Sequence, residues 1–188
     1  MTRVLRRRGL VLAAAALATS GCINTAVDEI SPSFETLQIL RKAEIQPVAL
    51  GNFSTAKGLD ARSINIRGSI MHPRKGSTFA AFLGESFATE LRAAGKLDPK
   101  APTVLSGELT ESKAGENMST GKGVLGATLF LTRDGRTVFS KPYRVESQWK
   151  SDFIGALAIP DAFMNYNSLY ALLVRQALSD PEMIAAMR

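Results

Sequence analysis

The most regular part of the sequence reads Val124-Leu-Gly-Ala-Thr-Leu-Phe-Leu-Thr-Arg-Asp-Gly-Arg-Thr-Val-Phe-Ser-Lys-Pro-Tyr-Arg-Val-Glu-Ser-Gln-Trp149. Two runs of alternating apolar and polar residues flank Arg133-Asp134-Gly135. Alternation with a period of two is typical of strands that bury one face. An Asp-Gly pair between two such runs favours a tight reversal of the chain. The stretch therefore predicts a β-hairpin.

The register of this hairpin can be predicted from its apolar residues. They are Leu125, Ala127, Leu129 and Leu131 on the first strand and Phe139, Tyr143, Val145 and Trp149 on the second. A two-residue Asp134-Gly135 turn would place the two sets on opposite faces. A three-residue loop, with Gly135 left-handed, pairs Leu129 with Phe139 and Leu125 with Tyr143. Because a buried face fixes register, we predict the three-residue loop.

Two amphipathic helices are predicted, one before and one after the hairpin. The first begins after Ser77 or Thr78 and carries an aromatic stripe at three- and four-residue steps. The second runs from Asp161, just after Pro160, to about Leu178. The stripe of the first helix consists of Phe79, Phe82, Leu83, Phe87 and Leu91. We expect this stripe to pack in the core, and a ligand groove is the alternative.

Three further segments, Gln46–Ser54, Ser63–Ile70 and Thr103–Ser112, have strand-like alternation. Residues 115–123 are expected to be a flexible connection. Residues 151–160 are unusually apolar for a connection, and they either tuck into the core, which we favour, or form a contact patch. The order strand, helix, strand, hairpin, helix predicts a two-layer α+β domain, with a mostly antiparallel sheet of four to five strands and two main helices on one face.

The first 22 residues have the pattern of an export signal. Four arginines precede the apolar run Leu10-Val-Leu-Ala-Ala-Ala-Ala-Leu-Ala18, and small residues lead to Cys22. The segment resembles a bacterial lipoprotein signal, although Thr19 stands where those signals usually carry leucine. We expect residues 1–21 to be removed and Cys22 to be acylated. Residues 22–44 are then a tether, with a short helix or an extended lead-in at Ser33–Lys42, and residues 45–188 form one domain.

The charge and cysteine content narrow the class of protein. Four of the 23 lysines and arginines lie in residues 1–21 and no acidic residue does, so 19 basic residues face 17 acidic ones afterwards. A net charge of +2 gives little support to nucleic-acid binding. Cys22 is the only cysteine, so no internal disulfide is expected.

The layout also resembles a known group of proteins. The strand Val48-Ala-Leu-Gly-Asn-Phe53, the helix end Glu90-Leu-Arg-Ala-Ala-Gly95, the strand Val104-Leu-Ser-Gly107 and the closing helix are similar to small lipoproteins with the fold of the TolB amino-terminal domain. YajG-type lipoproteins, the curli-secretion lipoprotein and activators of penicillin-binding proteins belong to this group. The resemblance implies a non-enzymatic envelope protein that docks to partners. Ile23, which is not the aspartate linked to inner-membrane retention, favours the periplasmic face of the outer membrane.

No catalytic or cofactor site is expected. The single histidine, His72, has no recognisable nucleophile motif near it, and metal sites need several ligands. Gly115–Gly123 lacks the spacing and the following helix of a phosphate loop. One basic cluster could contact lipid phosphates, cell-wall carboxylates or an acidic partner, although solvated loop charges are the commoner case. The cluster consists of Arg62, Arg67, His72, Arg74 and Lys75.

Overall fold

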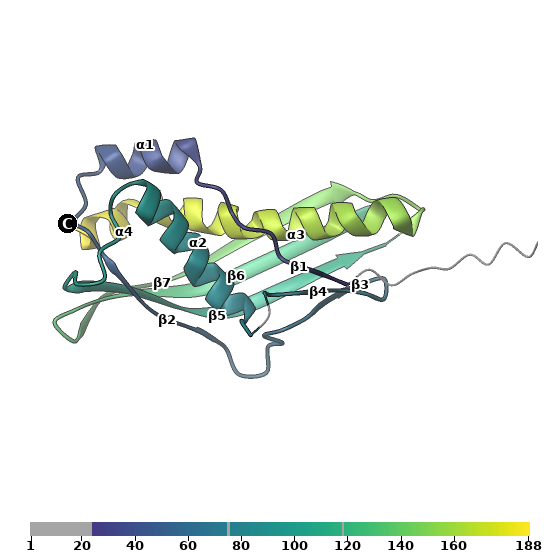
Figure 1. The fold of residues 1–188 in the computed structure, drawn as a ribbon, viewed down its shortest axis with the longest axis horizontal. Helices are drawn as coiled ribbons and strands as arrows, with labels where there is room; N and C mark the ends of the chain where they lie inside the picture. Colours follow the sequence, from purple (N-terminus) through teal and green to yellow (C-terminus); the bar gives the residue numbers. More distant parts are fainter. Residues whose placement is uncertain (1–23, 75, 118) are drawn as a thin grey trace, which may run out of the picture.

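The computed structural model describes residues 24–74, 76–117 and 119–188, and it confirms an α+β fold (Figure 1). Cys22, Ile23, Lys75 and the predicted signal lie outside these residues. The elements in chain order are β1 (Asn24–Ala26), α1 (Phe34–Lys42), β2 (Ala49–Thr55), β3 (Ile64–Ile66), β4 (Ser69–His72), α2 (Phe79–Ala93), β5 (Thr103–Glu116), β6 (Thr120–Arg133), β7 (Arg136–Lys150), α3 (Gly155–Leu178) and α4 (Pro181–Ala186).

The strands form two sheets. The larger has the order β2-β5-β6-β7 and the smaller the order β1-β4-β3. Both are mixed, because β2 pairs parallel with β5 and β1 pairs parallel with β4, whereas the other pairs are antiparallel. The larger sheet is thus the predicted, mostly antiparallel one. The smaller sheet was not predicted.

The β6–β7 hairpin has the predicted buried face but not the predicted register. Its turn is the two-residue one, since Arg133 pairs with Arg136, and both Asp134 (φ 53°) and Gly135 (φ 76°) are left-handed. The pairing then shifts by one residue at Val138, so that Leu131 lies opposite Phe139. This β-bulge, rather than a longer loop, brings the two apolar sets to one face. The three-residue loop was wrong because alternation does not show where the extra residue is inserted.

Two other segments also reverse direction more sharply than predicted. The segment Ser63–Ile70 is not one strand, because Arg67 (φ 51°) and Gly68 (φ 81°) form a tight turn between β3 and β4. The expected flexible connection at 115–123 is mostly strand, since β5 and β6 continue to a short turn. In that turn the Asn117 amide donates to the Thr120 carbonyl.

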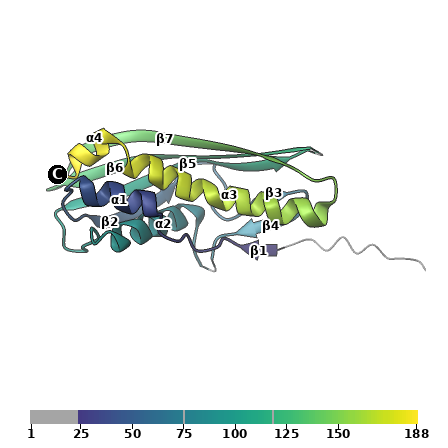
Figure 2. The same ribbon diagram turned by 90° about the horizontal axis from the view of Figure 1, so that it is seen from above.

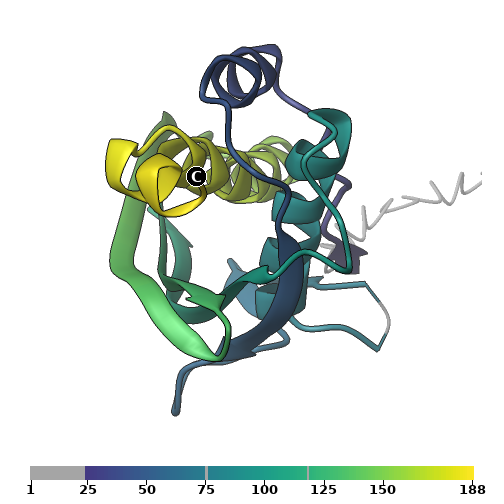
Figure 3. The ribbon, with the colours of Figure 1, turned by 90° about the vertical axis from the view of Figure 1, so that its left-hand side faces the viewer.

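Helices α2 and α3 cover one face of the larger sheet, which curves around them in the end-on view (Figures 2 and 3). The aromatic stripe of α2 is fully packed, with exposed fractions of 0–3%, so it belongs to the core and leaves no groove. Phe79 and Phe82 make edge-to-face contacts with Tyr166 and Tyr170 of α3. The sheet contributes its predicted apolar face to the same core.

Helix α3 begins six residues earlier than predicted. Pro160 lies inside it, where only the second turn lacks a hydrogen bond, and the burial of Ala158 and Ile159 favours the additional turn. The expectation that residues 151–160 tuck into the core is therefore correct only for part of the segment. Phe153 and Leu157 are exposed to solvent.

The expected tether is part of the fold. Strand β1 pairs with β4, and the amide of the buried Val27 donates to the His72 carbonyl at 2.9 Å. The short helix expected after it is α1, and the Ser33 side chain caps it by accepting from the Thr36 amide. None of the helices that the structure describes has both the length and the hydropathy of a membrane-spanning segment.

Candidate contact site

The structure brings together three members of the basic cluster. Because β3 and β4 are antiparallel, Arg62 before β3 lies close to His72 and Arg74 at the end of β4. These three side chains line a shallow pocket of about 230 Å³. The His72 Nδ1 lies 2.9 Å from the Arg62 carbonyl oxygen, which fixes the ring against the β3 side of the pocket. Lys75 lies outside the described residues.

Arg67 lies at the opposite end of the β3–β4 hairpin and forms an internal crosslink. Its guanidinium donates to the carbonyls of Asn117 (2.6 Å) and Asp152 (3.0 Å) and to the Ser151 hydroxyl (2.9 Å). Its Nε also lies 3.2 Å from the Glu116 carboxylate, whose side chain is fully buried. The grouping of Arg67 with the basic cluster was therefore wrong, since its donors are used within the domain.

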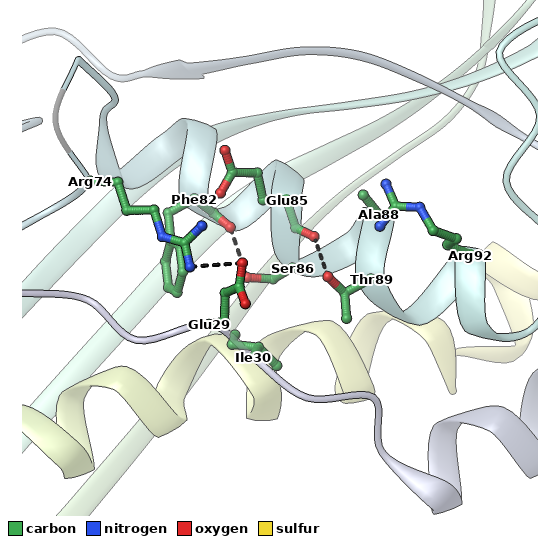
Figure 4. Close-up of a pocket in the computed structure, with 9 residues that line it drawn as sticks. All are labelled: Glu29, Ile30, Arg74, Phe82, Glu85, Ser86, Ala88, Thr89 and Arg92. Atoms are coloured by element: carbon green, nitrogen blue, oxygen red, sulfur yellow. Dashed lines mark hydrogen bonds and ion pairs between the residues drawn. The ribbon is translucent and has the colours of Figure 1, made fainter.

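Arg74 also borders a second pocket, of about 200 Å³, between α2 and the segment that follows β1 (Figure 4). Across this groove Arg74 forms an ion pair with Glu29 at 2.8 Å, and both side chains remain largely exposed. Glu85 and Arg92 of α2 add one charge of each sign. The surface around the pocket is thus mixed in charge and accessible, which suits contact with a polar partner.

The hydroxyl groups of this groove are held by the helix itself. Ser86 Oγ donates to the Phe82 carbonyl at 2.7 Å, and Thr89 Oγ1 donates to the Glu85 carbonyl at 3.0 Å. A nucleophilic hydroxyl instead needs a base beside it. Across residues 24–74, 76–117 and 119–188, no cluster of three or more histidine, cysteine or acidic side chains could hold a metal ion. The geometry therefore suits binding through charge and shape.

A buried carboxylate, Glu90, was missed by the sequence analysis. It lies on α2, three residues after Phe87, and is only 2% exposed. Its Oε1 accepts from the Ser33 amide at 2.8 Å, while no described group hydrogen-bonds to its Oε2. Burial raises the pKa of Glu90, and the Ser33 amide offsets only part of this effect. The signal was present, since an acid at a three-residue step from Phe87 falls on the buried stripe.

We expect Glu90→Gln to stabilise the protein at neutral pH by about 1 kcal/mol, because the amide needs no charge in the core. The native state binds the Glu90 proton more tightly than the unfolded state does. The wild type therefore loses stability as pH rises from its ordinary carboxyl pKa of 4.5 through the raised native pKa. The advantage of the variant should grow over that interval and vanish below it.

Urea unfolding of both proteins at a series of pH values measures this difference. Glu85→Gln removes the same charge from an exposed position of α2 and should not reproduce the gain. A Glu90→Gln protein that is less stable than the wild type at neutral pH would contradict the burial argument.

A second buried polar group consists of three hydroxyls in the core. Ser112 Oγ lies 2.8 Å from the Tyr166 hydroxyl, which lies 2.9 Å from that of Tyr170. Burial raises the pKa of Tyr166 to about 12 and also raises the pKa of Tyr170. Both rings are fully buried, so these hydroxyls satisfy one another and do not face a ligand.

The fold and the site together define a class: an α+β domain with a mixed sheet, two helices across one face and polar surface pockets. No family model matches the sequence, and no curated protein matches it. Protein XCC0632 from Xanthomonas campestris, of the family DUF330, is structurally similar, with a TM-score of 0.53 and 18% identity over 82% of this chain and 94% of that one. The chain therefore shares the fold of that protein.

Two further solved structures are more distant. A protein described as a lipoprotein from Caulobacter crescentus CB15 has a TM-score of 0.45 and 12% identity, over 80% of this chain and 96% of that one. The PelC dodecamer from Paraburkholderia phytofirmans has a TM-score of 0.40 and 20% identity, over 71% and 87%. Neither score is high enough to support an argument about this chain. The similarity to the TolB amino-terminal layout stays a prediction.

Proposed function

We propose that the protein is a cell-envelope lipoprotein, anchored by acyl chains on Cys22, that acts as a non-enzymatic docking module. The observation that carries this proposal is the sequence of residues 1–22, in which arginines, an apolar run and small residues precede the only cysteine. Two or more acyl chains hold a protein stably on a bilayer, whereas one gives only marginal binding. Ile23 favours the periplasmic face of the outer membrane.

The surface chemistry supports docking rather than catalysis. The pocket at Arg62, His72 and Arg74 offers cationic and aromatic groups to an acidic partner, and the neighbouring Glu29 limits its charge. The ring nitrogen of His72 that has a hydrogen bond faces a backbone carbonyl rather than an acid or a nucleophile. Lipid or glycan transport is the weaker candidate, because the aromatic stripe that would have formed its groove is packed in the core.

Labelled palmitate tests the anchor. We expect the wild type to incorporate the label and to sediment with membranes, and Cys22→Ala to do neither. A freely diffusing, unlabelled wild type would contradict the proposal.

Site-specific crosslinking tests docking. A photoactivatable residue at position 62 should capture an envelope partner, whereas one at Arg136, exposed at the start of β7, should not. Equal capture from both positions, or from neither, would count against this pocket as the docking surface.

A further inference from the structure

Exposed apolar side chains gather at the start of α3. Of the six large apolar side chains exposed in the described part of the chain, three lie within five residues: Phe153 (73%), Ile154 (58%) and Leu157 (56%). The other three are far from them in the sequence or farther along α3: Phe34, Val138 and Met164. Single exposed apolar residues are ordinary, but a cluster indicates a contact surface. We name Phe153, Ile154 and Leu157 the apolar tip.

The apolar tip is held in place by the structure around it. The Ile154 amide donates to Asp152 Oδ1 at 2.8 Å, and Ile154 is the N-cap residue of α3. Arg67 fixes the preceding residues through the Asp152 carbonyl and the Ser151 hydroxyl. The tip therefore presents its side chains from a fixed helix start.

The chain enters the domain at the same end of the molecule. Asn24 pairs with Ile70 on β4, and Arg67, in the turn that precedes β4, bonds to Asp152 beside the tip. Two perpendicular views show the start of β1 and the start of α3 at this end (Figures 1 and 2). Cys22 precedes Asn24 by two residues, so their Cα atoms can be separated by no more than about 7 Å.

The charges near this end suit an anionic surface. Lys122 and Lys150 lie close to the β5–β6 turn, and both are exposed. Neither forms an ion pair with another residue that the structure describes. This turn lies at the tip, because the Ser151 amide donates to the Ser119 carbonyl and Arg67 bonds to the Asn117 carbonyl. Exposed lysines at a membrane-facing end are attracted to anionic headgroups.

We propose that the apolar tip inserts into the headgroup region of the bilayer that holds the acyl chains of Cys22. This inference rests on the proposed function, because the anchor brings this end to the lipid. The absence of a slack tether favours lipid over a partner protein, since β1 begins two residues after Cys22. Apolar side chains beside lysines are typical of surfaces that lie in the interface of a membrane.

An environment-sensitive fluorophore tests the inference. The full chain carrying Leu157→Cys, with Cys22 acylated and its thiol therefore blocked, is labelled with nitrobenzoxadiazole. It is then reconstituted into vesicles of phosphatidylethanolamine and phosphatidylglycerol, with or without doxyl-labelled lipid. Met164→Cys is the matched control, because Met164 is also exposed (65%) but lies seven residues, about 10 Å, farther along α3. The emission of Trp149, the only tryptophan, checks folding.

We expect the emission of the label at position 157 to shift to the blue and to be quenched by doxyl lipid, and that at position 164 to change in neither respect. Emission at position 157 that stays unshifted, in protein whose acylation is verified by mass, would overturn the inference and leave the proposed function intact. A blue shift without quenching would assign the tip to a second copy of the chain. An unacylated Cys22 would overturn both proposals, and the mass distinguishes this outcome.

Discussion

Replacing Gly121 by alanine is expected to lower the free energy of unfolding by about 3 kcal/mol, because Trp149 occupies the space of the new methyl group. A Cβ atom at Gly121 would lie 2.1 Å from the indole, and Gly121 lies directly opposite Trp149 on β6 and β7. The ring cannot stay there. Its displacement also breaks the 2.7 Å hydrogen bond from Trp149 Nε1 to Glu116.

Urea unfolding measures this loss, and tryptophan fluorescence shows its cause. Since Trp149 is the only tryptophan, its emission should shift to the red when the ring leaves the core. Gly115→Ala is the matched control, because it lies in the same hairpin and a Cβ there meets no atom within 4 Å. Its stability should stay within about 0.5 kcal/mol of the wild type. Equal stability of the two variants would refute the packing described for Trp149.

Replacing Arg67 by alanine should destabilise the protein by about 2 kcal/mol. The substitution leaves the fully buried Glu116 carboxylate without its cation and removes three hydrogen bonds that join the β3–β4 turn to the β5–β6 turn and to α3. The Arg67 side chain is 22% exposed, so water compensates for part of the loss. Thermal unfolding measures the effect.

Two further variants separate the charge from the hydrogen bonds. Arg62→Ala removes an exposed arginine of the contact site and should change stability by no more than about 0.5 kcal/mol. Adding Glu116→Gln to Arg67→Ala should restore part of the lost stability, because the unpaired buried charge is gone. If the double variant is less stable than Arg67→Ala alone, the ion pair is not the main contribution of Arg67.

The sequence predicted those parts of the fold that depend on periodicity. Apolar spacing identified the buried faces of β6, β7 and α2 correctly, because burial requires the same period in the sequence and in space. It could not show the bulge at Val138, since the inserted residue leaves both faces apolar. It placed the start of α3 too late, because proline usually ends a helix and the burial of Ala158 outweighed that preference here.

The turns were misjudged for a different reason, which is that distant contacts stabilise them. Arg67 is not a common turn residue, and its left-handed conformation is supported by bonds from its side chain to residues 50 to 85 positions away. The glycines near position 121 suggested flexibility, whereas they make room for Trp149. Within the candidate site, proximity in the sequence correctly grouped Arg62, His72 and Arg74. It could not show that Arg67 faces the other end of the hairpin.

The central claim, that Cys22 is an acylated anchor, is tested most directly by mass spectrometry of the amino-terminal tryptic peptide from membrane-purified protein. Trypsin should release residues 22–41, because no lysine or arginine lies between Cys22 and Arg41. We predict a peptide that begins at Cys22 and carries the added mass of two or three acyl chains. A peptide with an unmodified Cys22 thiol, or one that still contains residues before Cys22, would contradict the account.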